Sequence, residues 1–444
     1  MKILLISTNR LKKIMPPMPV GLAYIASNID ERSHELKLLD LMFTKSPLEE
    51  TMVVLKEFQP EIIGVSIRNL DNQDARHTEY CLPAVKELVE TCKKYSHARI
   101  IVGGTAFTTL PEEIFNYLNP HLGIVAEGER VFPELVNRIE QTLSYEDLPG
   151  LVFKTNGKIQ INQPLFANLD GLPLPKIEHL DYWKYREKGG LGNVLIKLGC
   201  PFECAYCDAP QIIGDTFRKR PIEAIIDEIE IMQKRFGIRE LFFNDPVFNI
   251  PIDYAKDLCR ELIGRKLAVG WICTFHPSEF DRELIELMKK AGCRLAVLSP
   301  DTGSPKMLAV LQKGFDLDRV REACQILENL KLDYVLDILL GGPGEDRETV
   351  KETFNFLKSV RPTIVNFTVG LRILPGTKLA QIALDKGIIS TESDLMKPKF
   401  YISPEIKGWI GKRIWLERVK NPSLILRPLI FLISVMHRKL RHNR

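Results

Sequence analysis

Residues 200–207 read Cys200-Pro-Phe-Glu-Cys204-Ala-Tyr206-Cys207 and directly follow the apolar, strand-like stretch 193–198. We therefore expect the three cysteines in a loop at the carboxyl end of a strand. Three thiolates this close together can bind one face of a four-iron cluster. A structural zinc ion is the alternative, but it usually takes a fourth nearby Cys or His, and the nearest histidines are distant in sequence. A cluster held by three cysteines leaves one iron free for another ligand.

Strand-like and helical stretches alternate from residue 193 onward, and the cysteines follow the first strand. Six such units predict a partial (β/α)6 barrel, whose chemistry lies at the carboxyl ends of its strands. The predicted domain spans residues 191–390, and a small helical extension over 391–444 follows it. The predicted strands are 193–198, 239–244, 270–274, 294–299, 333–340 and 363–369.

Residues 1–142 repeat the same alternation and predict a separate α/β domain. Strands that alternate with helices indicate a doubly wound parallel sheet, in which ligands bind at the carboxyl ends of the strands. Residues 143–190 are rich in Pro and Gly and are interpreted as a linker that carries a small hairpin. The predicted strands of the first domain are 2–7, 36–41, 61–67, 98–103 and 122–126.

Composition narrows the class of protein further. A chain of 444 residues with 45% apolar and 27% charged residues is typical of a globular protein of two or three domains. The net charge of +4 gives no support to a nucleic-acid partner. The first residues lack the pattern of a signal peptide, and no apolar run is long enough to span a bilayer. We therefore expect a cytoplasmic protein.

The cysteine motif resembles the signature of the radical S-adenosylmethionine (SAM) superfamily, Cys-x3-Cys-x-aromatic-Cys after the first barrel strand. Cys200, Cys204, Tyr206 and Cys207 match it at every position. The resemblance implies that the open iron binds the amino and carboxylate groups of SAM and that Tyr206 packs near the adenine. Electron transfer from the cluster then gives a 5′-deoxyadenosyl radical. An external electron donor, such as flavodoxin or ferredoxin, is implied as a partner.

The resemblance also implies where SAM binds at the ends of later strands. Asn244 and Asp245 occupy the place of the Gly-Gly-Glu motif that contacts the SAM amino group, although their sequence differs from it. Asp301 and Thr302 resemble a pair that holds the ribose hydroxyls. Gly341 and Gly342 resemble a glycine motif that lets the backbone approach SAM; an ordinary strand-to-helix turn is the alternative interpretation.

The first domain resembles the cobalamin-binding domain that precedes the SAM barrel in one large subfamily. The resemblance rests on residues 17–23, on 64–66 and on 102–105, and on Glu127-Gly-Glu after the fifth strand. A small Ser66 and the backbone of Gly103-Gly104 can line a slot for the nucleotide tail of the cofactor, because a side chain at either glycine would fill it. The implied cobalamin contacts are Ser66, Arg68, Gly103, Gly104, Thr105, Glu127 and Gly128.

The loop after the first strand lacks the Asp-x-His-x-x-Gly motif that many cobalamin domains use for a histidine ligand to cobalt. We therefore predict base-off cobalamin without a histidine ligand. Arg68 is a candidate for the lower face of the corrin ring, where a guanidinium has no lone pair to offer the metal. The alternative is that Arg68 pairs with Asp71 in a structural turn.

A cobalamin domain joined to a SAM barrel implies methylation of a carbon that an ordinary base cannot activate. One SAM would methylate cobalt to give methylcobalamin, and a second would give the radical that takes hydrogen from the substrate. Some relatives catalyse rearrangement or cyclisation instead, and that alternative stays open. Methylthiolation is disfavoured because residues 1–142 offer only Cys81 and Cys92 for a second cluster. A non-catalytic sensor is the alternative of another class.

The substrate class depends on the carboxyl-terminal residues. Residues 422–436 are mostly apolar and a basic end follows them. Such a stretch indicates peripheral contact of 422–444 with a membrane and a lipid-like substrate. A helix docked on the barrel, with a solvated basic tail, is the preferred alternative and leaves a small-molecule substrate.

Overall fold

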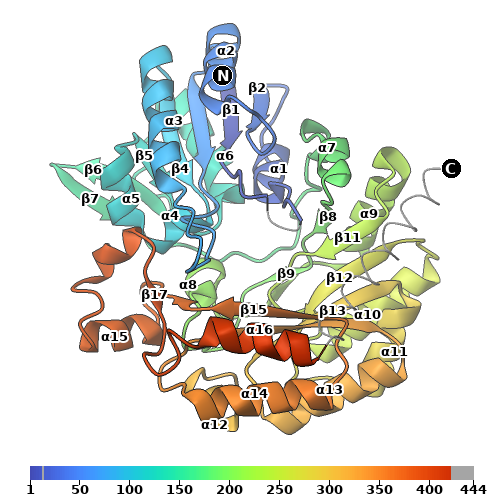
Figure 1. Cartoon of the computed structure of the whole chain (residues 1–444). Helices are drawn as coiled ribbons and strands as arrows, with labels where there is room; N and C mark the ends of the chain where they lie inside the picture. Colours follow the sequence, from blue (N-terminus) through green and yellow to red (C-terminus); the bar gives the residue numbers. More distant parts are fainter. Residues whose placement is uncertain (13–14, 422–444) are drawn as a thin grey trace.

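The computed structural model describes residues 1–12 and 15–421. Their two large sheets, one in the N-terminal domain and one in the barrel, lie one above the other in Figure 1. The strands of the first sheet lie in the order β2 (Glu35–Asp40), β1 (Lys2–Ser7), β3 (Ile62–Ser66), β4 (Arg99–Gly103), β5 (Leu122–Ile124), β6 (Leu151–Thr155) and β7 (Lys158–Ile161). Those of the second lie in the order β15 (Ile364–Val369), β14 (Asp333–Leu340), β13 (Cys293–Asp301), β12 (Gly270–Phe275), β11 (Glu240–Phe243) and β8 (Gly192–Val194). Both architectures agree with the sequence prediction.

Five parallel strands build the N-terminal sheet, with helices on both faces. The buried, β-branched side chains of β1 and β3 explain why these segments form central strands. The strands are β1 (Lys2–Ser7), β2 (Glu35–Asp40), β3 (Ile62–Ser66), β4 (Arg99–Gly103) and β5 (Leu122–Ile124). The helices are α1 (Val20–Ser27), α2 (Pro47–Phe58), α3 (Leu82–Tyr95), α4 (Thr105–Thr109), α5 (Pro111–Leu118) and α6 (Gly128–Glu140).

The hairpin expected within residues 143–190 extends this sheet. β6 (Leu151–Thr155) pairs antiparallel with β5 and with β7 (Lys158–Ile161). Asn156 and Gly157 both have positive φ, as a two-residue hairpin turn requires. Two short helical segments then lead to the barrel: η1 (Ile177–His179) and α7 (Tyr182–Glu187).

The barrel sheet contains the six predicted strands, all parallel. A two-stranded ladder of β9 (Lys197–Leu198) and β10 (Arg218–Lys219) flanks the cysteine loop. The barrel strands are β8 (Gly192–Val194), β11 (Glu240–Phe243), β12 (Gly270–Phe275), β13 (Cys293–Asp301), β14 (Asp333–Leu340) and β15 (Ile364–Val369). The helices are α8 (Ala209–Ile213), α9 (Ile222–Phe236), α10 (Ile252–Gly264), α11 (Arg282–Lys290), α12 (Pro305–Val310), α13 (Leu317–Asn329) and α14 (Arg347–Ser359).

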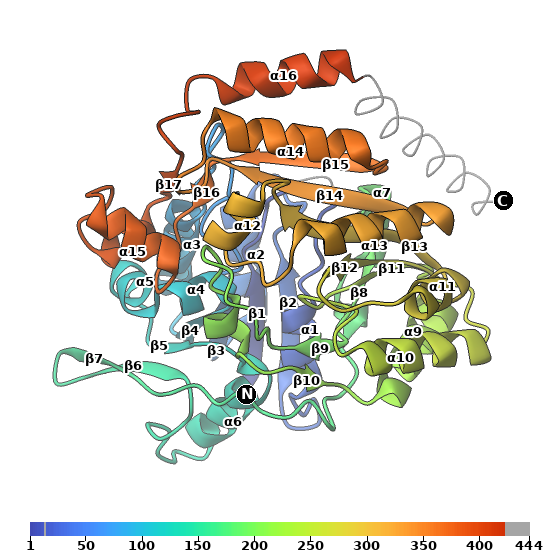
Figure 2. The same cartoon turned by 90° about the horizontal axis from the view of Figure 1, so that it is seen from below.

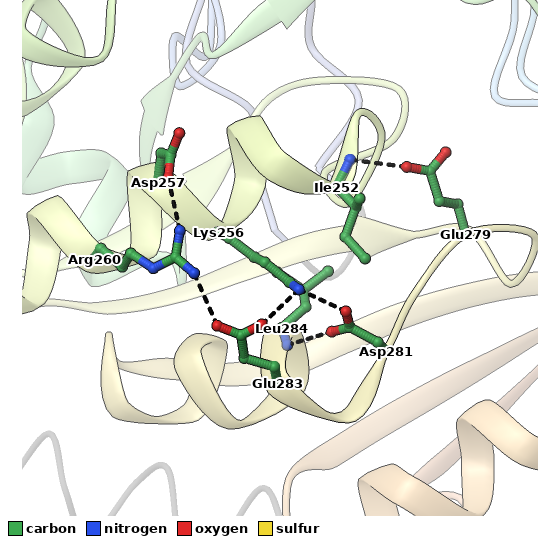
Figure 3. A network of polar contacts seen from close by, with 8 residues as sticks. All are labelled: Ile252, Lys256, Asp257, Arg260, Glu279, Asp281, Glu283 and Leu284. Atoms are coloured by element: carbon green, nitrogen blue, oxygen red, sulfur yellow. Dashed lines mark hydrogen bonds and ion pairs between the residues drawn. The ribbon is translucent and has the colours of Figure 1, made fainter.

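A polar network joins two neighbouring helices on the outside of the barrel (Figure 3). Lys256 on α10 contacts Asp281 at 2.5 Å and Glu283 at 2.7 Å, and Arg260 contacts Glu283 at 2.8 Å. Asp281 also caps α11 by accepting a hydrogen bond from the Leu284 N–H. The network fixes how α10 and α11 lie against each other, at a distance from the cysteine loop.

The last described elements follow the sixth barrel strand. α15 (Lys378–Asp385) and η2 (Glu392–Met396) precede α16 (Ile410–Lys420), and β16 (Leu371–Arg372) pairs with β17 (Phe400–Tyr401). α16 packs over α14 (Figure 2), where the buried Glu417 contacts Lys358. No helix in the described part of the chain is long and apolar enough to cross a membrane. The membrane contact predicted for 422–444 lies outside the described residues.

Buried polar contacts hold the two domains together. Arg220, at the start of α9, donates hydrogen bonds to Tyr24 on α1 (2.9 Å) and to Glu228 on α9 (2.7 Å). Arg218 of β10 forms an ion pair of 2.5 Å with Glu127 of the N-terminal domain. Because charged groups are costly to bury without partners, these contacts favour a single arrangement of the two domains.

Candidate functional site

The cysteine loop lies at the barrel mouth between β9 and α8. The Cys200 N–H donates to the Gly214 carbonyl (2.9 Å), and the Cys207 N–H donates to the Cys204 carbonyl (3.0 Å). The Ala205 N–H donates to the Leu311 carbonyl (3.0 Å), which ties the loop to the end of α12. Cys200 is buried and the other two cysteines are half-buried, and all three are free thiols.

The chemistry of these thiols fits a cluster. Burial raises the pKa of all three thiols, that of Cys207 to about 12, and neighbouring cysteines raise the pKa of Cys200 and of Cys207 further. Bound iron removes this penalty because it stabilises thiolates directly. No group of His, Cys, Asp or Glu among the described residues is arranged to hold a single metal ion. In a cubane each thiolate binds a different iron, so the three sulfurs need not share one centre.

Tyr206 is fixed by a polar triad. Its hydroxyl donates to Asp301 (2.5 Å), and Lys313 contacts the same carboxylate at 2.7 Å. Lys313 also donates to the Tyr206 hydroxyl (3.2 Å). Burial, followed by the Asp301 charge, raises the pKa of Tyr206, so the phenol stays protonated. The triad joins the motif tyrosine to the end of β13, and Lys313 was missed because nothing local in the sequence connects it to Tyr206.

The other predicted SAM residues make contacts within the protein. Thr302 is fully buried and its hydroxyl lies 3.0 Å from that of Thr353 on α14. The N–H groups of Gly341 and Gly342 both donate to Glu345, which forms a closed turn after β14. Burial raises the pKa of Glu345 to about 7. These contacts agree with the ordinary-turn interpretation of the glycines, and SAM binding by these three residues stays a prediction.

Asn244 and Asp245 are adjacent in sequence but face different surroundings. Asp245 is buried and forms an ion pair with Lys197 of β9. Burial raises the pKa of Asp245, and Lys197 opposes this shift. Asn244 instead lines the space between the domains. The two SAM contacts predicted here are therefore not brought to one surface.

All seven residues predicted to contact cobalamin line one cavity of about 310 Å³ between the domains. The cavity begins at the carboxyl ends of β3, β4 and β5, where a doubly wound sheet binds its ligands. Its lining on this side includes Ser66, Arg68, Gly103, Gly104, Thr105, Glu127 and Gly128. Their convergence makes this edge of the sheet fit the tail of a cobalamin.

The reason for the two central glycines differs from the expected one. A Cβ at Gly103 would lie 3.2 Å from the Ile124 carbonyl, and one at Gly104 would lie 2.8 Å from the Ile67 carbonyl. Gly104 also has a φ of +96°, which favours glycine. The expectation that side chains there would fill the cofactor slot is wrong, because they would meet neighbouring backbone. Gly103 lets β4 approach β5, and Gly104 lets the chain after β4 approach Ile67 beyond β3, so both shape the slot indirectly.

Arg68 lines the cavity between the domains. No hydrogen bond or ion pair to the rest of the described chain holds its guanidinium, although burial among protein atoms lowers its pKa. Asp71 pairs with Arg372 at 2.7 Å instead. The alternative interpretation, an Arg68–Asp71 turn, is therefore wrong. Arg68 also lines an adjoining cavity of about 380 Å³.

The barrel supplies the opposite wall, which the sequence analysis missed. Leu198 and Ile212, which flank the cysteine loop, line the cobalamin cavity together with Asn193 and Leu195. The only local signal is Asn193, a polar residue within an apolar strand. On the side of the N-terminal domain, Glu129 of α6 also lines the cavity, and burial raises the pKa of its carboxyl group to about 7. The cavity thus extends from the N-terminal sheet to the cysteine loop.

Two family models match this chain, one for each domain. The radical SAM superfamily matches residues 194–357, and the B12 binding domain matches residues 15–136. The chain belongs to the cobalamin-binding radical SAM enzymes. As a radical SAM enzyme it uses a [4Fe-4S] cluster and SAM, and its B12 domain supports cobalamin as the third cofactor. The alternatives of a zinc site and of a non-catalytic sensor do not fit this family.

Relatives of this radical SAM enzyme match most of the chain. An uncharacterized methyltransferase of Pyrococcus horikoshii is 26% identical over 97% of this chain and 95% of its own length. The tryptophan 2-C-methyltransferase of Streptomyces laurentii is 26% identical over 83% of this chain and 72% of its own. The structure of the radical SAM methyltransferase TsrM of Kitasatospora setae covers 94% of this chain and 88% of its own, with 22% identity and a TM-score of 0.83.

Proposed function

We propose that the protein methylates an unactivated carbon of a small-molecule or lipid-like substrate. One observation carries the proposal: residues that flank the cysteine loop, Leu198 and Ile212, line the same cavity as the seven cobalamin residues. When bound, the cofactors supply a 5′-deoxyadenosyl radical and a methyl group. A reaction between them needs both held within a few ångströms of one substrate atom. The methyltransferase names of relatives support the same reaction.

The residues of the chain contribute position and protection. The Tyr206–Asp301–Lys313 triad fixes the cysteine loop against β13. The Arg220–Tyr24 hydrogen bond and the Arg218–Glu127 ion pair hold the domains over the cavity. A site between two domains limits the access of oxygen and of stray hydrogen donors, which would quench a reactive radical.

The products distinguish this proposal from rearrangement or cyclisation, a reaction class that also occurs among named relatives. We expect anaerobic turnover of the cluster-loaded, cobalamin-loaded protein with SAM and an added reductant to yield a methylated product, S-adenosylhomocysteine and 5′-deoxyadenosine. Mass spectrometry of reactions with methyl-deuterated SAM measures the transfer directly. Formation of 5′-deoxyadenosine with an unmethylated product would contradict methylation. Candidate substrates come from soluble metabolite and lipid extracts, so the fraction that supports turnover decides between the two substrate classes.

We further propose that cobalamin binds base-off and that Arg68 faces the lower side of cobalt. The guanidinium has no hydrogen-bond or ion-pair partner among the described residues, and it cannot donate an electron pair to the metal. Among the described residues that line the two interdomain cavities there is no histidine.

Electron paramagnetic resonance tests this arrangement. We expect the cobalt(II) form of the wild-type protein to show no nitrogen hyperfine splitting on the cobalt signal. An Arg68→His variant provides the matched comparison, because a histidine at this position can approach the same face and add a nitrogen splitting. Splitting in the wild-type spectrum would overturn the base-off proposal.

A further inference from the structure

Two asparagines stand side by side on the barrel wall that faces the N-terminal domain. Asn193 lies on β8, and Asn244 directly follows β11. These strands are neighbours, and Phe242 pairs with Asn193 in their register. Because side chains alternate along a strand, Phe242 and Asn244 share one face with Asn193. Both asparagines line the cavity of about 310 Å³ and the adjoining cavity of about 380 Å³.

Neither carboxamide has a hydrogen-bond partner in the part of the chain that the structure describes. Asn193 is only 9% exposed, and the cavities take up that remaining exposure. Each carboxamide offers two N–H donors and a carbonyl acceptor to a molecule that occupies these cavities. The partner is therefore expected among the groups that fill these cavities.

The cavity walls identify that partner. The wall opposite the asparagines consists of the residues of the cobalamin slot, Ser66 and Gly103 among them. The corrin ring is much larger than the nucleotide tail and needs space beyond the slot. The ring must extend to where the two cavities meet, and the residues common to both cavities are Pro17, Arg68, Asn193 and Asn244. The rim of a corrin ring carries amide side chains, which match carboxamides in both donors and acceptors.

We propose that Asn193 and Asn244 bind the peripheral amides of the corrin ring from the barrel side. The cobalamin site is then shared between the domains, although the B12 family model covers only residues 15–136. This inference rests on the proposed function, in which cobalamin occupies this cavity. It assigns Asn244 to cobalamin, whereas the sequence resemblance assigned it to SAM.

Corrinoid binding tests the proposal without turnover. The cluster-loaded, corrinoid-free protein is titrated with aquacobalamin and with cobinamide, which keeps the ring amides but lacks the nucleotide. We expect Asn193→Leu and Asn244→Leu each to weaken binding about fivefold, and the double variant more than about tenfold. The factor should be similar for both corrinoids, because the lost contacts are to the ring. A Ser66→Leu variant, which obstructs the tail slot, should weaken binding of cobalamin alone.

Asn355→Leu, at an exposed position of α14, is the matched control and should bind both corrinoids as wild type does. Iron content and the thermal midpoint check that each variant is folded. Unchanged corrinoid affinity of the folded double variant would overturn the proposal, as would a loss confined to cobalamin. If Asn244→Leu weakened SAM binding and left corrinoid binding intact, Asn244 would be assigned to the SAM site instead. Failure of the wild-type protein to bind either corrinoid would instead refute the proposed function.

Discussion

Replacement of Gly199 by alanine is expected to remove the iron–sulfur cluster without changing any cysteine. Gly199 directly precedes Cys200 and has a φ of +91°, a conformation that alanine rarely adopts. An alanine Cβ would lie 1.9 Å from the Thr216 carbonyl oxygen, a contact that only a shift of the backbone can relieve. The neighbouring Cys200 N–H bonds to Gly214, so the shift would displace the first cluster ligand.

We expect the Gly199→Ala protein to bind less than about half the iron of the wild type and to lose about 2 to 4 kcal/mol of unfolding free energy. Iron and sulfide analysis after anaerobic reconstitution measures the first quantity, and denaturant titration the second. Gly237→Ala is the matched control. Gly237 also has a positive φ, but a Cβ there meets no atom within 4 Å, so the variant has the strain of the conformation alone. Equal stability loss and full iron in both variants would show that the Thr216 contact is unimportant.

The alternation of strands and helices was sufficient to predict both domains. Each parallel strand is buried on two faces and is therefore a short apolar run, such as residues 2–7 and 333–340, and each helix has one apolar stripe. The cysteine loop was predictable because its three candidate ligands all lie within residues 200–207. The cobalamin residues were predictable as a set because loops after parallel strands meet at one edge of the sheet.

The contacts that decide individual roles were not predictable from the sequence. The ribose contact of Asp301 stays a prediction, but no local pattern indicated that Tyr206 and Lys313 contact its carboxylate. Asp71 was offered as a partner of Arg68, but it pairs with Arg372, a residue far away in the chain. These pairs depend on how separate elements pack, and no local pattern encodes that packing. The barrel wall of the cobalamin cavity was missed for the same reason, since it becomes a wall only when the domains meet.

Lys197→Met is expected to destabilise the barrel strongly although it lies outside the cofactor cavities. Lys197 and Asp245 form an ion pair whose side chains are both completely buried, and Lys197 also donates to the Phe248 carbonyl (3.0 Å). Removing the ammonium leaves a buried carboxylate without a counter-charge, which costs about 3 to 5 kcal/mol. The β9 strand that carries Lys197 leads directly into the cysteine loop, so we also expect reduced iron binding.

A double variant distinguishes the effect of losing the lysine side chain from the effect of leaving the Asp245 carboxylate unpaired. Lys197→Met combined with Asp245→Leu removes both charges and should recover most of the lost stability, since apolar replacement of a buried pair is often neutral.

The pH dependence of stability gives a second criterion. Burial raises the pKa of Asp245, and this rise is larger when Lys197 is absent. At a pH above the ordinary pKa of an aspartate, the folded single variant therefore keeps a proton on Asp245 that the unfolded chain releases. Its deficit relative to the double variant should therefore shrink as the pH falls from 7 towards 4. A deficit that is independent of pH would mean that lost packing of the lysine stem, and not the uncompensated carboxylate, destabilises the strand.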